Sequence, residues 1–187
     1  ITLDIGKQDR SLRCNNFSML DHDADGDQEL VLSLGSPYRG FAILDLDSQG
    51  RLVIIKKIRP DEMLVGSGLL YSAVVDYDND GYEDLLAISP EGNTIKAQPF
   101  YNIGGIFDSG PLIRKNFEGI SGILHNSFQL TDWDADGFKD VLAPFRSGDI
   151  IALTLTPATL VIERVPVQPG PLTQIEIADF NQDNYKD

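Results

Sequence analysis

The sequence contains few of the residues that define several common classes of protein. Only one of its 187 residues is cysteine, Cys14, which excludes an internal disulfide framework and a cysteine-based zinc site. No apolar run approaches the ~18 residues that a membrane-spanning helix needs, so we expect no membrane insertion of this segment. The Gly-x-Ser-x-Gly elbow, the phosphate-binding Gly-Lys-Ser/Thr loop and the His-Glu-x-x-His motif are also missing.

Basic residues are also scarce, and the acidic ones are unevenly distributed. The chain has 15 Lys and Arg against 29 Asp and Glu, which gives a net charge of −14. Four nine-residue windows, starting at Asp21, Asp76, Asp132 and Asp179, hold 17 of these acids, and the remaining 151 residues carry a net charge of +1. Negative charges held this close together repel one another, which raises the electrostatic free energy of the protein unless a cation neutralises them. No basic stripe is left to contact phosphates, so nucleic-acid binding is disfavoured.

The four windows are copies of one pattern. They read DHDADGDQE, DYDNDGYED, DWDADGFKD and DFNQDNYKD, and they start 55, 56 and 47 residues apart. Each has Asp or Asn at positions 1, 3 and 5, Gly or Asn at position 6 and an acid at position 9. The predicted metal ligands are the side chains at positions 1, 3, 5 and 9 and the backbone carbonyl at position 7: Asp21, Asp23, Asp25, Asp27, Glu29, Asp76, Asp78, Asp80, Tyr82, Asp84, Asp132, Asp134, Asp136, Phe138, Asp140, Asp179, Asn181, Asp183, Tyr185 and Asp187.

This spacing suits a calcium ion. Carboxylates at alternate positions lie on the concave side of a tight loop, and glycine at position 6 permits the positive φ that turns the next carbonyl inward. A flexible shell of hard oxygen donors favours Ca²⁺, whereas Mg²⁺ prefers fewer carboxylates and more water. The fourth loop should bind most weakly, because Asn181 removes one charge and Asn184 replaces the glycine.

Two other interpretations of the windows are less favourable. Aspartate-rich turns can cap hairpins by accepting backbone hydrogen bonds, but such turns do not require three acids at alternate positions. An EF-hand has the same spacing at its start, but it needs a glutamate at position 12 and a helix on each side. Position 12 is occupied by Leu32, Ala87 and Ala143, and the flanking runs are typical of strands.

These flanking runs predict an all-β fold with antiparallel strands. A strand-like run precedes each window and another follows three of them, and two further candidates joined by turn residues complete each full unit. Four short strands in 40–50 residues is the size of a β-propeller blade. We therefore divide residues 1–187, as a single domain, into units at 14–66, 67–122 and 123–168 and the start of a fourth at 169–187. A propeller needs ~4–8 blades, so we expect a partial propeller belonging to a larger one. The predicted strands are 16–20, 30–34, 41–46, 52–58, 70–75, 85–88, 128–131, 141–143, 150–156, 160–165 and 173–178.

The chain resembles the FG-GAP/VCBS repeat family, which includes the propellers of integrin α-subunits. The resemblance depends on the motif Asp-x-Asp-x-Asp-Gly-x-x-Asp followed by a hydrophobic strand, and on Leu34-Gly35-Ser36-Pro37, which is similar to the family's Gly-Ala-Pro element. It implies a propeller in which the loop between the first and second strands of each blade binds Ca²⁺. Glu29 and Asn184 depart from the usual Asp and Gly, and Gly40-Phe41 reverses the Phe-Gly order.

Composition and resemblance together predict a calcium-stabilised recognition or adhesion module without catalytic activity. Its expected partners are a protein or glycan ligand and the remaining blades of the propeller. We expect it outside the cell, secreted or on the surface, because loops of this kind bind calcium weakly and millimolar calcium is found there. The alternative is the propeller part of a polysaccharide-degrading enzyme whose active site lies outside this segment.

Two further predictions concern individual side chains. Cys14 is expected to be a small buried side chain. The aromatic residues at positions 2 and 7 are expected to pack around the loops rather than to bind sugars; they are Tyr77, Tyr82, Trp133, Phe138, Phe180 and Tyr185.

Overall fold

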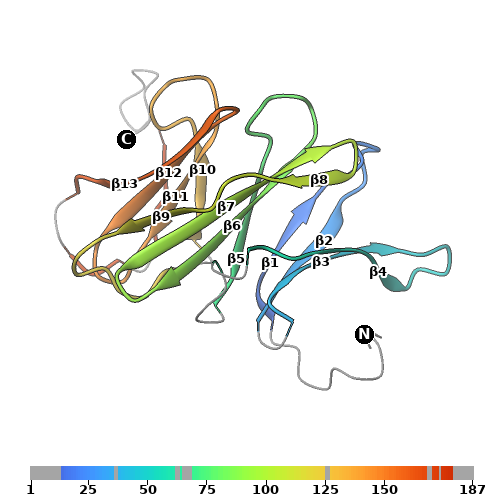
Figure 1. Ribbon diagram of the computed structural model, residues 1–187, viewed down its shortest axis with the longest axis horizontal. Coiled ribbons are helices and arrows are strands. Elements are labelled where there is room, and N and C mark those ends of the chain that lie inside the picture. The colour runs from blue at the N-terminus through green and yellow to red at the C-terminus, as the bar shows by residue number, and fades with distance from the viewer. Residues whose placement is uncertain are drawn as a thin grey trace.

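The computed structural model describes residues 14–35, 38–61, 64, 69–124, 127–167, 170–172 and 174–178, and this part of the chain is all-β. Its strands form three antiparallel sheets, which lie side by side in chain order (Figure 1). Among the described residues there is no helix long and apolar enough to cross a membrane. The prediction of an all-β, antiparallel architecture is therefore confirmed.

The first and third sheets each have four strands joined in sequence order. The first contains β1 (Cys14–Leu20), β2 (Glu29–Leu34), β3 (Gly40–Leu46) and β4 (Leu52–Ile58). The third contains β10 (Gln129–Thr131), β11 (Asp140–Pro144), β12 (Ile150–Thr156) and β13 (Thr159–Val165). These bounds agree closely with the strands predicted from alternating and β-branched residues.

The second sheet has five strands, one more than the sequence predicted. It contains β5 (Tyr71–Val75), β6 (Asp84–Glu91), β7 (Thr94–Ile103), β8 (Ile106–Ser109) and β9 (Ile113–Asn116). Both β8 and β9 pair with the long strand β7, and together they form its outer neighbour.

The break between β8 and β9 has a local cause at Gly110. A side chain there would meet Pro99 Cγ at 2.7 Å, and the Gly110 N–H donates to the Pro99 carbonyl at 2.9 Å. Ser109 pairs with Phe100 and Ile113 pairs with Ala97, so the outer strands advance by four residues where β7 advances by three. The extra residue makes a bulge that interrupts the ladder.

Each sheet turns one face to the preceding sheet and the other to the following one. The residue directly after the position-9 acid faces backward, that is, toward the sheet that precedes its own in the chain. Leu85 packs on the first sheet and Val141 on the second. The next residue faces forward: Val31 packs on the second sheet and Leu86 on the third. Two apolar cores therefore hold the three sheets together, one at each interface.

The two outermost faces follow the same rule. On the first sheet, Leu30 belongs to an apolar cluster that faces away from the second sheet. On the third sheet, Leu142 packs against Ile175 and Ile177, and the Gln129 Nε2 donates to the Ile175 carbonyl at 3.2 Å. Residues 174–178 therefore cover the third sheet where a next unit would begin. They form no strand, so the strand predicted at 173–178 is wrong for these described residues.

Candidate metal centre

Three of the four acidic windows lie in the described part of the chain, and each connects the first and second strands of its own sheet. They join β1 to β2, β5 to β6, and β10 to β11, and all three project from the same side of the molecule, along the upper edge in Figure 1. The predicted ligands of the fourth window, which lie outside the described residues, are Asp179, Asn181, Asp183, Tyr185 and Asp187. They stay a prediction.

The three loops share an unusual backbone conformation. The position-6 glycines have φ of 95°, 95° and 93°, as the sequence predicted, and open space surrounds the point where a Cβ would lie. Glycine is therefore needed for its backbone conformation and not for lack of room. The residues at position 4 also have positive φ, which the sequence did not predict because two of them are alanine: Ala24, Asn79 and Ala135.

In each loop the backbone brings three carboxylates together. Their oxygen atoms lie within 4.8 Å of one another in the sets Asp21–Asp23–Asp25, Asp76–Asp78–Asp84 and Asp132–Asp134–Asp136. The sequence predicted every member of these sets. A cluster of this kind can hold a divalent cation, since hard oxygen donors are the ligands that such ions prefer.

Some of the carboxylate oxygens already accept backbone hydrogen bonds. In the third loop Asp132 Oδ2 accepts the Gly137 N–H at 3.1 Å, and Asp136 Oδ1 accepts the Phe138 N–H at 2.9 Å. The other two loops have the same pair of bonds. These bonds hold the loop in shape and leave further carboxylate lone pairs available, since each carboxylate has about four acceptor positions.

The acid at position 9 connects the loop to the sheet below it. Asp84 and Asp140 are fully buried, and Glu29 is nearly so. Asp84 accepts the Tyr77 N–H at 3.2 Å through Oδ2 and, through Oδ1, the Asn102 N–H of β7 at 2.7 Å. Asp140 makes the equivalent bonds to Trp133 and to β12. These carboxylates therefore tie the two ends of the loop to the third strand of the sheet.

Burial changes the proton affinity of these two acids. Desolvation raises the pKa of Asp84 from 3.8 to about 7, although the hydrogen bonds from Asn102 and Tyr77 act in the opposite direction. Desolvation likewise raises the pKa of Asp140 from 3.8 to about 6. Ionisation of these two buried carboxylates therefore costs free energy, unless a cation lies nearby.

The stability of the protein in the presence of a chelator should therefore decrease as the pH rises. The folded state holds protons on Asp84 and Asp140 that the unfolded chain has already lost above their ordinary pKa of 3.8. The contribution of these groups is complete below about pH 4 and is lost as the pH passes through about 6 and 7. Urea unfolding in the presence of the chelator at pH 5 and pH 8 measures this, with Asp84→Asn as the control that should flatten the dependence. An equal slope in the variant would contradict the assignment to Asp84.

One carboxylate oxygen in the second loop has no partner among the described residues. Asp76 Oδ1 is buried and makes no hydrogen bond to this part of the chain, while its other oxygen accepts the Gly81 N–H at 3.2 Å. A buried carboxylate oxygen without a partner costs the full desolvation energy of that atom. Its neighbours in the cluster are the carboxylates of Asp78 and Asp84, so the atom that would best satisfy it is a cation.

The first loop differs from the others at positions 2 and 9. His22 Nδ1 lies 2.7 Å from Glu29 Oε2, which also accepts the His22 N–H at 2.9 Å. Glutamate is longer than aspartate, and its carboxylate here reaches the imidazole. His22, Asp23 and Glu29 form a second group whose ligand atoms lie within 4.8 Å of one another.

The aromatic side chains around the loops differ in burial. Tyr77 is fully buried in the core between the second and third sheets, with its ring 5.3 Å from that of Tyr101 in an edge-to-face arrangement. Tyr82 and Phe138, at position 7, are half-buried, whereas Trp133 is 39% exposed. The predicted packing role of these aromatic side chains therefore fits Tyr77 best.

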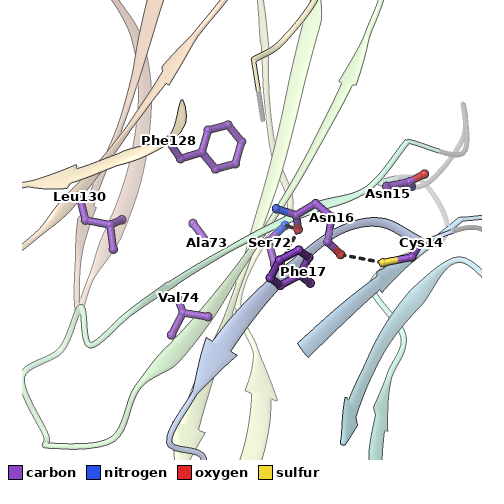
Figure 2. Close-up of a pocket in the computed structure, with 9 residues that line it drawn as sticks. All are labelled: Cys14, Asn15, Asn16, Phe17, Ser72, Ala73, Val74, Phe128 and Leu130. Atoms are coloured by element: carbon purple, nitrogen blue, oxygen red, sulfur yellow. Dashed lines mark hydrogen bonds between the residues drawn. The ribbon is translucent and has the colours of Figure 1, made fainter. Parts of the chain in front are cut away.

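A pocket of about 690 Å³ lies where the first strands of the three sheets approach one another (Figure 2). The sequence did not indicate it, because its lining comes from three distant segments. Asn16 of β1 crosses to the second sheet, where its Oδ1 accepts the Ser72 N–H at 3.1 Å and the Ser72 hydroxyl at 2.9 Å. Cys14, expected to be buried, is exposed at the start of β1, and its Sγ donates to the Asn16 carbonyl.

Comparison of the chain with protein-family models and with curated proteins finds no match. The function of the chain is therefore inferred from the geometry of its loops and sheets.

Proposed function

We propose that this chain is a calcium-stabilised recognition module in which each acidic loop binds one Ca²⁺. The observation that carries the proposal is the buried Asp76 Oδ1, which has no partner among the described residues and belongs to a cluster with the carboxylates of Asp78 and Asp84. The residues would hold the ion through the carboxylates at positions 1, 3 and 5, with the acid at position 9 and the position-7 carbonyl closing the shell. The ion supplies positive charge that offsets the repulsion between these carboxylates, and it joins the first two strands of each sheet.

We further propose that the sheets are blades of a β-propeller of the FG-GAP/VCBS type. The repeated packing rule supports this, because each sheet presents a backward and a forward apolar face. The backward face of the first sheet borders a hollow of about 810 Å³ whose lining includes Leu30, Leu44 and Leu52 and four acids of the first loop, Asp23, Asp25, Asp27 and Glu29. Another sheet of the same kind would cover this face, as the remaining blades of the propeller.

The partner of such a module is a protein or a glycan, and its place is outside the cell. Loops of this type bind calcium at about 10⁻⁴–10⁻³ M in extracellular modules, so they would be occupied there. Rigid sheets with loops on one side present a surface on which recognition residues are held in place.

The single tryptophan of the chain offers a direct test of metal binding. Trp133 lies at position 2 of the third loop, between Asp132 and Asp134, so selective excitation of the indole should sensitise luminescence from Tb³⁺ bound in that loop. We expect sensitised emission that excess Ca²⁺ competes away. Asp132→Asn should weaken Tb³⁺ binding at least tenfold, whereas Asp108→Asn, at an exposed acid on β8, should not change it. Absence of sensitised emission, or equal emission from the Asp132 variant, would refute the proposal.

A further inference from the structure

The first loop is held in place by residues of the second sheet. Glu83 Oε2, at position 8 of the second loop, accepts the Asp21 N–H at 2.8 Å. Asn102 of β7 donates from Nδ2 to the His22 carbonyl at 2.8 Å and to the Glu83 carbonyl at 3.0 Å. The backbone on both sides of the first predicted ligand, Asp21, is therefore fixed by another sheet.

The same asparagine is also bonded to the second loop. The Asn102 N–H donates to Asp84 Oδ1 at 2.7 Å, and Asn102 Oδ1 accepts the Gly105 N–H at 2.9 Å. Asn102 is only 1% exposed, so its amide group is held by these bonds in one orientation. A continuous set of hydrogen bonds thus runs from Asp84, the closing acid of the second loop, through Asn102 to His22 in the first.

Among the three loops that the structure describes, this bridge is particular to the first two. The strand position of Asn102 is occupied by Leu46 in the first sheet and by Leu155 in the third. Leu155 keeps the backbone bond, since its N–H donates to Asp140 Oδ1 at 3.1 Å, but a leucine side chain cannot hydrogen-bond to a neighbouring loop. Position 8 of the third loop is Lys139, which has no carboxylate to accept the N–H of Asp76.

We propose that Glu83 and Asn102 are positioning residues for the metal site of the first loop and couple its occupancy to that of the second. The inference rests on the proposed calcium binding. An ion in the second loop holds Asp84, and with it Glu83 and Asn102, in the arrangement that orients Asp21. Filling the second loop therefore raises the calcium affinity of the first, and by linkage the converse holds. The third loop binds independently of the first two.

Site-resolved calcium titration by NMR tests this on the whole chain, since each loop has its own reporter. The position-6 glycine N–H donates to the position-1 aspartate in every described loop: Gly26 to Asp21, Gly81 to Asp76 and Gly137 to Asp132. Each glycine amide resonance should therefore move when its own loop fills. If none moves in the unmodified protein, the proposed function fails, and that result is separate from any result on coupling.

Two variants remove the bridge in different ways. Asn102→Leu installs the residue of the other two sheets, and Glu83→Met removes the carboxylate oxygen that accepts the Asp21 N–H while keeping a side chain of similar length. In both, the calcium midpoint reported by Gly26 should rise by about fivefold or more while that of Gly137 stays unchanged. Lys139→Gln, at the same loop position in the third repeat, should leave the Gly26 and Gly81 midpoints unchanged. An unchanged Gly26 midpoint in both bridge variants would overturn the proposal.

A double-mutant cycle separates coupling from a general loss of stability. Asp76→Asn, which disables the second loop, should raise the Gly26 midpoint in the unmodified background by the same factor. In the Asn102→Leu background it should have little further effect, because the bridge is already broken. Full and equal effects of Asp76→Asn in both backgrounds would show that the loops do not communicate through Asn102.

Discussion

Removal of calcium should lower the melting temperature of this protein by about 10 °C. At a calcium concentration ten times the dissociation constant, each occupied loop contributes about 1.4 kcal/mol, and the three described loops together about 4 kcal/mol. For a chain of this length, 1 kcal/mol corresponds to roughly 2–4 °C in melting temperature. The physical reason is that the loops gather charges whose repulsion is released by unfolding and offset by an ion only in the folded state.

Thermal unfolding followed by circular dichroism, with calcium and with a chelator, measures this shift. Magnesium at the same concentration serves as a control and should restore less of the stability, because it retains its water and fits a carboxylate-rich loop poorly. The double variant Asp76→Asn/Asp132→Asn should lose at least two-thirds of the calcium effect. An identical melting temperature with calcium and with chelator would show that the loops do not bind the ion in the folded protein.

Replacement of Tyr77 by alanine should cost about 3–5 kcal/mol of folding free energy, the largest effect that we expect from a single substitution. The ring is fully buried at the interface between the second and third sheets and makes an edge-to-face contact with Tyr101. Its removal leaves a cavity in the apolar core that joins the two sheets, and the loop that begins with Asp76 loses its anchor.

Tyr77→Phe is the matched control for this prediction. The Tyr77 hydroxyl is buried and makes at most a poorly aligned hydrogen bond to the Phe100 backbone in the described part of the chain, so its removal should change the stability by no more than about 1 kcal/mol in either direction. Urea unfolding of both variants in the presence of calcium gives the two values. A large loss in Tyr77→Phe would mean that the hydroxyl, and not the ring, determines the stability at this position.

The local features of the fold could be predicted from the sequence. Alternating and β-branched runs predicted the strands of the first and third sheets closely, because strand pairing along a hairpin depends on neighbouring residues. The acidic windows supplied the members of all three carboxylate clusters, which come from positions 1, 3 and 5 in the first and third loops and from positions 1, 3 and 9 in the second, since the acids at these positions of a tight loop lie close together wherever the loop occurs. Glycine at position 6 predicted the positive φ there for the same local reason.

The features that depend on contacts between strands came only from the tertiary structure. The bulge at Gly110 places this residue so close to Pro99 of the neighbouring strand that a Cβ there would lie 2.7 Å from Pro99 Cγ. The burial of Asp76 Oδ1, which has no partner among the described residues, could not be foreseen from the spacing of the acids.

Residues only a few positions apart specify an all-β chain with acidic loops between first and second strands, so these features could be predicted without the structure. The tertiary structure brings Glu83 and Asn102 to the first loop and buries Asp84 and Asp140, which raises the pKa of both carboxyl groups well above the ordinary 3.8. These depend on contacts between segments up to 80 residues apart, which no local pattern specifies.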